Sequence, residues 1–235
     1  MRTILLFAAI LAFCSSCNMF GGQRVSGNGK ITSENRNVSA FTSIDASGSL
    51  KVQVRQDSST AVKIETDENL LEYVEVYVKG NTLVIKSRDG FNLDPSKDLV
   101  IYTVAPVYRS IQVSGSGDII SENTISGSEP LEMGVSGSGN INVQVALPRL
   151  SAHVSGSGNV LLKGTSKEFS GSVSGSGSIK AFELATDVST LHISGGADVE
   201  ITANQKLDVN VSGSADVKYK GNAQVSQSIS GSGSV

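Results

Sequence analysis

The feature that most constrains this chain is a seven-residue phrase that fills its second half. The first full copy is Val113-Ser114-Gly115-Ser116-Gly117-Asp118-Ile119, and later copies occupy 135–141, 154–160, 173–179, 193–199, 211–217 and 229–235. The serines that open the copies are Ser114, Ser136, Ser155, Ser174, Ser194, Ser212 and Ser230. Their spacing of about 20 residues is typical of repeat proteins, in which each unit packs only on its neighbours.

The apolar pattern around the phrase predicts short stacked strands. An apolar residue precedes the Ser-Gly-Ser-Gly and another follows it, six positions apart, so both would face the same side of an extended chain. A second alternating pattern, such as Ile141, Val143 and Val145, leads to a turn signal such as Leu147-Pro148-Arg149. We therefore expect an all-β fold, a β-solenoid with about 18–22 residues and two or three short strands per coil.

The small residues of the phrase have a mechanical explanation. Glycine supplies positive φ angles where a coil bends, and serine bonds the turn through its hydroxyl. Stacked serines are expected to form hydroxyl ladders. One further column of turn-forming residues follows the phrase: Asp118, Asn140, Asn159, Ser178, Asp198, Asp216 and Ser234. We interpret this column as structural, in preference to a ligand-binding role.

The first half of the chain is less regular. Worn copies of the phrase at 25–31 and 44–50 predict that the array begins near residue 25, as one domain over 25–235 with regular repeats over 111–235. Residues 52–104 alternate as strands do and predict an irregular antiparallel or mixed β cap. Within it we expect a turn of helix at 67–72, a hairpin at 74–86, a loop at 91–97 and a strand at 98–104.

The amino terminus has the pattern of a bacterial lipoprotein signal. Arg2 precedes an apolar run over 4–13, which is too short to span a bilayer, and the small residues Ser15 and Ser16 precede Cys17. The sequence predicts a signal peptide over 1–16, a lipid on Cys17 that binds the membrane, and a tether over 17–24. An ordinary secretory signal or a short amphipathic anchor is the alternative. Cys14 and Cys17 are the only cysteines, so no disulfide is expected in the mature chain.

The sequence offers little catalytic or cofactor chemistry. Trp is absent, and a net charge of -3 without a basic block argues against binding of nucleic acid. His153 and His192 each stand just before a copy of the phrase, where surface residues are expected, so we assign no catalytic, cofactor or zinc site. A weak calcium site between two aspartates of the turn column, such as Asp198 and Asp216, stays open as a minor alternative.

The alternating stretch around 74–85, followed by serial Val-Ser-Gly-Ser-Gly-[Asp/Asn/Ser]-[Ile/Val] units behind a lipoprotein signal, resembles the head GIN domain family of Bacteroidetes. The resemblance covers about residues 24–235. It implies a β-helix-like fold, a location in the cell envelope and an adhesin function. The family supplies no agreed catalytic residues that could be carried over.

Together these observations favour a lipid-anchored, non-enzymatic envelope protein, on the outer membrane, that binds a glycan or a protein. Two alternatives stay open. The first is a self-assembling structural protein, for which we expect a homodimer through the last coil, residues 209–235, because an uncapped coil can pair with another chain. The second is a polysaccharide-acting enzyme, which the scarcity of aromatic residues in the repeats disfavours.

Overall fold

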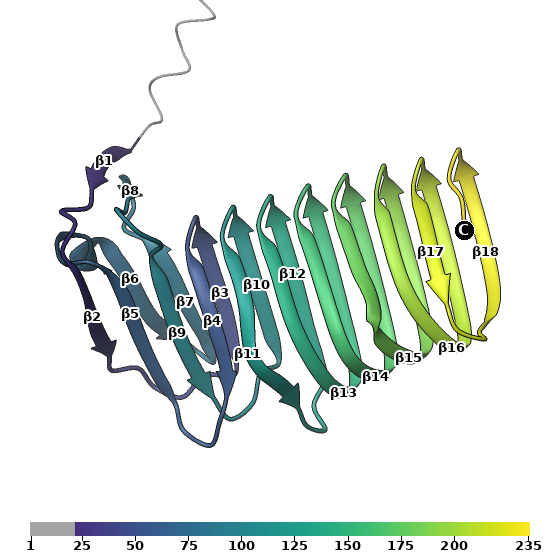
Figure 1. Cartoon of the computed structure of the whole chain (residues 1–235), viewed down its shortest axis with the longest axis horizontal. Coiled ribbons are helices and arrows are strands. Elements are labelled where there is room, and N and C mark those ends of the chain that lie inside the picture. The colour runs from purple at the N-terminus through teal and green to yellow at the C-terminus, as the bar shows by residue number, and fades with distance from the viewer. Residues whose placement is uncertain (1–21) are drawn as a thin grey trace, which may run out of the picture.

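The computed structural model describes residues 22–235, which form a β-solenoid with a cap at its amino-terminal end (Figure 1). The predicted signal peptide and Cys17 lie outside the described residues. Most of the expected tether at 17–24 also lies outside the described residues, and strand β1 begins within that range, at Gln23. Within residues 22–235 no helix has the length and apolar character needed to cross a bilayer.

Within residues 22–235 the elements follow one another in chain order, and η2 is a 3₁₀ helix. They are β1 (Gln23–Ser26), β2 (Ile31–Arg36), β3 (Ser43–Gly48), β4 (Lys51–Gln56), β5 (Ala61–Asp67), η2 (Glu68–Tyr73), β6 (Val74–Lys79), β7 (Thr82–Ser87), β8 (Phe91–Asp94) and β9 (Val100–Ala105). The regular part continues with β10 (Ser110–Gly115), β11 (Asp118–Ser126), β12 (Leu131–Gly137), β13 (Asn140–Gly156), β14 (Asn159–Gly175), β15 (Ser178–Gly195), β16 (Asp198–Gly213), β17 (Asp216–Lys220) and β18 (Gln224–Gly231).

Each coil has two halves that belong to two different sheet layers. The first layer contains β4, β11, the first halves of β13 to β16, and β17; the second layer contains β3, β10, β12, the second halves of β13 to β16, and β18. All of these strands are parallel to their neighbours. Each of the strands β13, β14, β15 and β16 is continuous over 16 to 18 residues and runs through both layers, where two or three short strands per coil were expected.

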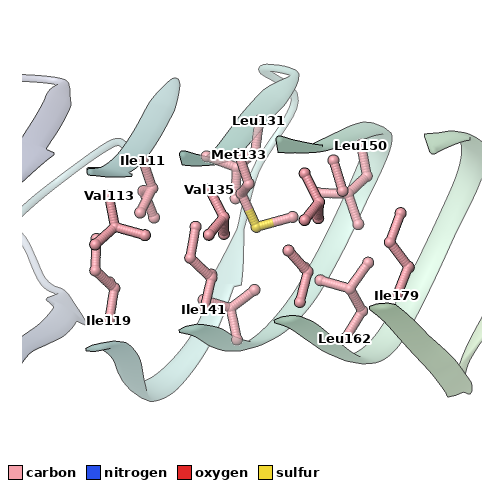
Figure 2. Close-up of a cluster of buried hydrophobic side chains, with 14 of the residues drawn as sticks. Ile111, Val113, Ile119, Leu131, Met133, Val135, Ile141, Leu150, Leu162 and Ile179 are labelled. Carbon is pink, nitrogen blue, oxygen red and sulfur yellow. The ribbon is translucent and has the colours of Figure 1, made fainter. Parts of the chain in front are cut away.

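The alternation of apolar side chains builds the core between the layers. In β13 the buried residues are spaced by two up to Leu147, and the spacing then shifts by one so that Leu150 is buried. This shift at Pro148-Arg149 is the corner where the strand passes from the first layer to the second. Figure 2 shows side chains of the second layer, among them Val135, facing side chains of the first layer such as Ile141. The β-branched residues suit such a sheet core because their shape packs well on a pleated surface.

The phrase sets the register of the stack. The opening serine of each copy lies beside its equivalent in the next coil, and Ser47 of the worn copy at 44–50 extends the same column: Ser47, Ser114, Ser136, Ser155, Ser174, Ser194, Ser212 and Ser230. The prediction of a β-solenoid is therefore confirmed. The worn copy at 25–31 does not join the stack, because β1 pairs with β8 in a separate two-stranded sheet.

Most of the cap, from β5 to β9, is an insertion between the first two coils in the sequence, but it lies outside them in space, and β1 and β2 join it from before the first coil. β3 and β4 pair directly with β10 and β11, so Lys51–Gln56 belongs to the first coil and not to the irregular part. In the cap, β7 pairs with β3 and β9 pairs with β4, both in parallel. The outer strands are antiparallel: β6 pairs with β7, β5 pairs with β9, and β2 pairs with β5. The predicted hairpin at 74–86 is confirmed as β6 and β7, and the predicted helical turn as η2. The expected loop at 91–97 is partly wrong, since Phe91–Asp94 forms β8.

Candidate functional site: the serine face

The outward side chains of the second layer form a flat polar surface, which we name the serine face. It has three columns that run along the solenoid. The first contains Ser110, Glu132, Ser151, Ser170, Thr190, Asp208 and Ser226; the second contains Gln112, Gly134, His153, Ser172, His192, Asn210 and Ser228; the third is the column of phrase serines from Ser114 to Ser230. Neighbouring members of a column lie one strand spacing apart, about 4.8 Å.

Stacking explains why these residues form a surface. In each coil the apolar residues of the second layer point inward, so the residues between them point outward. Because the register is the same from coil to coil, outward residues that are about 20 positions apart in the sequence become neighbours. The expected surface positions of His153 and His192 are confirmed, because both side chains are exposed and lie in one column with Ser172 between them.

Two hollows mark the serine face. A shallow groove of about 310 Å³ lies between the second and third columns near the carboxyl-terminal coils, lined by Ser172, Ser174, His192, Ser194, Asn210 and Ser212 among others. A second groove of about 420 Å³ lies at the corner beside the first column. Its lining includes the apolar Leu131, Leu150 and Phe169, and Arg149 and Glu168 form an ion pair beside them at 2.9 Å.

The second groove was not predicted from the sequence. Leu147-Pro148-Arg149 has the pattern of a turn, and only the register shows that Arg149 stacks on Glu168. The apolar lining is equally nonlocal, because Leu131, Leu150 and Phe169 stack in consecutive coils. A signal was present in the sequence, since a large aromatic residue is rare in these repeats, but it did not distinguish a core residue from one that lines a groove.

The hydroxyl ladder expected among the phrase serines does not form: among residues 22–235 no hydrogen bond joins these serines to one another. Side-chain hydrogen bonds instead link the turn column from Asp118 to Ser178, and Asp216 to Ser234. Asn140 Nδ2 donates to Asp118 Oδ1 at 2.7 Å, Asn159 Nδ2 donates to Asn140 Oδ1 at 2.8 Å, and Ser178 Oγ donates to Asn159 Oδ1 at 2.6 Å. Each side chain donates to the preceding coil, which satisfies the amides along the ladder.

The ladder changes character at Asp198 and Asp216, which are adjacent in register. Two carboxylates accept hydrogen bonds and cannot donate them, so no amide-type bond links these coils. Ser234 Oγ resumes the pattern by donating to Asp216 Oδ1 at 2.6 Å. Within the described part of the chain no group of three acidic, histidine or cysteine side chains converges as a metal site would require, and Lys180 and Lys218 line the same hollow as the two aspartates.

Comparison with known proteins places this architecture in a family. A sequence profile described as "Putative auto-transporter adhesin, head GIN domain" matches residues 40–223. Among functionally curated proteins none matches the sequence.

Several solved structures share the fold over nearly their whole length. A "putative adhesin" from Bacteroides fragilis NCTC 9343 is 25% identical, with a TM-score of 0.80 over 89% of this chain and 98% of that one. A "Putative lipid binding protein" from Parabacteroides distasonis ATCC 8503 is 26% identical, with a TM-score of 0.75 over 91% of this chain and 100% of that one. A "putative adhesin" from the same organism is 27% identical, with a TM-score of 0.73 over 91% and 99%. The family model matches residues 40–223 and the fold matches solved structures over about nine-tenths of the chain, so the chain belongs to the head GIN domain family.

Proposed function

We propose that this protein is a lipid-anchored, non-enzymatic binding module of the outer membrane, an adhesin that holds its ligand on the serine face. The observation that carries the proposal is the strict register of the second layer, which builds one continuous polar surface from the outward residues of successive coils. The description of the family and of two similar structures as adhesins supports the same conclusion.

The composition of the surface indicates the chemical class of the ligand. The first two columns of the serine face contain hydroxyl, amide and imidazole groups with two acidic side chains, Glu132 and Asp208, and no Lys or Arg. Such a surface exchanges hydrogen bonds with neutral polar groups. The cations at its border, Arg149 and Lys206, are paired with Glu168 and Asp208, so they form no basic patch for a polyanion such as nucleic acid. A glycan chain or a polar protein surface fits these groups. In the groove at the corner, the exposed Pro130 and the half-buried Val188 offer a place for a ring face or an alkyl group.

The arrangement of the serine face supports binding in preference to catalysis. A serine nucleophile needs a base within hydrogen-bond reach and a third group that orients the base. Within residues 22–235, no hydrogen bond joins His153 or His192 to a serine hydroxyl or to a carboxylate. The nearest members of the neighbouring coils in their column are Ser172 and Asn210, neither of which is acidic.

A screen of residues 22–235 against a glycan array and against host matrix proteins tests the proposal. The control is a chain that lacks 140–158, which removes one whole coil and joins Gly139 to Asn159 in register. We expect saturable binding by the intact chain and weaker binding by the shortened chain, whose folding is checked by circular dichroism. Absence of any saturable ligand, or cleavage of an array glycan by the intact chain, would contradict the proposed function.

The anchor is tested separately in the producing bacterium. Incorporation of labelled palmitate and recovery in the outer-membrane fraction are expected for the native chain, because acyl chains contribute about 0.8 kcal/mol per buried CH₂ to membrane binding. Cys17→Ala is expected to abolish both, whereas Cys14→Ala keeps both. Labelling that survives Cys17→Ala would show that the lipid is attached to another residue.

A further inference from the structure

We propose that the carboxyl-terminal edge of the second layer is a self-association surface, through which two copies of the chain join tail to tail. The contact is antiparallel pairing of β18 with β18 of a second copy, about a two-fold axis at Gln227. The proposal is independent of the binding function of the serine face.

The backbone of β18 has one free edge. Among residues 22–235, β18 pairs only with β16. Ser232 N–H donates to Gly213 O at 2.9 Å, so this residue directs its backbone groups toward β16. In a parallel strand alternate residues direct both backbone groups to the same side, so Ser226, Ser228 and Ser230 also face β16. Val225, Gln227 and Ile229 therefore direct their N–H and C=O groups to the free edge.

The same residues leave apolar surface uncovered. Ile229 is 37% exposed, whereas its neighbour in the preceding coil, Val211, is 3% exposed. Val225 is half-buried beside the fully buried Leu207. Because these side chains continue the inward columns of the second layer, a further strand on this edge would cover them as β18 covers β16.

The edge also lacks the residues with which proteins usually prevent strand pairing. Exposed edge strands are protected by charges, prolines or bulges. At the cap end, the outer strands β2 and β6 contain Glu34 and Arg36, and Glu75 and Lys79. β18 reads Gln-Val-Ser-Gln-Ser-Ile-Ser-Gly, with no charge and no proline. In the first layer, Ser234 already occupies part of the corresponding edge, because Val217 N–H donates to Ser234 O at 2.8 Å. The open edge is therefore that of β18.

The symmetry of β18 identifies a second copy as the occupant. A two-fold interface requires that residue i contact residue j and that j contact i. About Gln227 the strand is a palindrome of residue types, with Ser226 matching Ser228 and Val225 matching Ile229. With Gln227 at the centre of antiparallel pairing, Val225 of each copy lies opposite Ile229 of the other. The free backbone groups of Val225, Gln227 and Ile229 then form hydrogen-bonded pairs across the two-fold axis. No like charges meet in this register.

Cysteine cross-linking tests the register directly, since residues 22–235 contain no native cysteine. In a hydrogen-bonded antiparallel pair the Cα atoms are about 5.5 Å apart, which lies within the span of a disulfide. Gln227→Cys is therefore expected to give a covalent dimer under mild oxidation. Ser230→Cys is the matched control, because in this register the two copies of position 230 lie about 20 Å apart. No dimer from Gln227→Cys, or equal dimer from both variants, would overturn the proposal.

Sedimentation equilibrium tests the association of the unmodified surface. Residues 22–235 are expected to show a monomer–dimer equilibrium below about 1 mM. Gln227→Lys sets two like charges at the axis and is expected to weaken the dimer at least about tenfold. Asn142→Lys adds the same charge on the exposed first layer and is expected to leave the equilibrium unchanged. A strict monomer at about 1 mM, or equal weakening by both variants, would contradict the inference.

Discussion

Glycine is required in the phrase where the chain turns from the second layer to the first. Gly156 has a φ of +117°, and a Cβ there would lie 2.5 Å from the carbonyl oxygen of Gly137 in the preceding coil. Both the backbone conformation and the close approach of the neighbouring coil exclude a side chain. The bend of the chain and the close stacking of the coils therefore both depend on the absence of a Cβ at Gly156.

Gly156→Ala is expected to lower the free energy of unfolding by about 1–3 kcal/mol or more, because it imposes a strained φ and a backbone clash. Gly196→Ala is the matched control. Gly196 lies in the same turn two coils away, at a position without a positive φ, and a Cβ added there would have no atom within 4 Å. Its substitution is expected to be neutral or to stabilise by a few tenths of a kcal/mol. Urea unfolding of both variants measures the difference, and equal losses would contradict this account of the turn.

Asp67 holds the cap together from a fully buried position. Its carboxylate accepts hydrogen bonds from the N–H of Gly29 at 2.7 Å and from the N–H and hydroxyl of Ser96 at 2.8 and 2.6 Å. Desolvation by burial raises the pKa of Asp67, but the hydrogen bonds from Ser96 and Gly29 outweigh it and lower the pKa below its ordinary value. One side chain thus ties two loops of the cap to β5.

Asp67→Asn is expected to cost about 1–3 kcal/mol near neutral pH, because the amide loses charge-assisted hydrogen bonds. The pKa of the Asp67 carboxyl is lower in the folded chain than in the unfolded chain. The carboxylate therefore contributes fully to the free energy of unfolding above the unfolded pKa of about 4, and this contribution is lost as the pH falls through the folded pKa. The stability difference between the native chain and Asp67→Asn should therefore shrink below about pH 4. A difference that stays constant from neutral pH down to about pH 2 would contradict the role of the carboxylate.

Single residues divide into those that local chemistry predicts and those that it does not. The positive φ of the first glycine in each phrase and the stacked turn column follow from the residue types, and both are present in the structure. Asp67 and Phe169 were not assigned a role in advance. The partners of Asp67 are 38 and 29 residues away, and the groove beside Phe169 forms only when three coils stack.

Between elements, the turn column is a ladder with two steps that lack a side-chain hydrogen bond, Ser178 to Asp198 and Asp198 to Asp216; only the second brings two carboxylates together. Asn140 donates to Asp118 across the equivalent step near the other end of the array. Asp216→Asn would reproduce that arrangement, because an amide at this position can donate to Asp198 and still accept from Ser234. We expect a gain of about 0.5–1.5 kcal/mol in unfolding free energy, from one new hydrogen bond and the loss of a like-charge contact.

The control for this gain is Asp187→Asn, which removes the same charge away from the ladder. Thermal unfolding at low and high salt separates the two contributions to the gain, since salt screens the repulsion between exposed carboxylates but leaves the hydrogen bond in place. An Asp216→Asn variant no more stable than Asp187→Asn would show that the column is not bonded as described.

Strands with a strong local pattern were predictable, whereas their partners were not. The hairpin at 74–86, the strand near 98–104 and the helical turn all appear close to their expected places. The phrase at 25–31 has the right residues but pairs outside the stack, because pairing depends on which distant strand is available and not on the phrase alone. Phe91–Asp94 was expected to be a loop for the same reason, since its strand is stabilised by β1, almost 70 residues earlier.

At the scale of the whole solenoid, residues 22–235 have a cap at one end, and at the other end β18 has one edge that no strand of this range covers. The cap carries β1, which is the first strand of the described chain, and β18 lies at the opposite end (Figure 1). An anchor at Cys17 would attach the chain to a membrane at its cap end. Tail-to-tail pairing through β18 would join two serine faces into one longer surface with a cap at each end, which increases the avidity for a repetitive ligand.

The most direct test of the account asks which face of the solenoid binds. Once the screen has identified a ligand, its dissociation constant is measured for Ser174→Glu/His192→Glu, which charges the groove of the serine face, and for Asn142→Glu/Gln144→Glu, which adds the same charge to exposed positions on the first layer. The account predicts at least about tenfold weaker binding for the first variant and unchanged binding for the second. Equal affinities for both variants, or a loss confined to the first-layer variant, would contradict it.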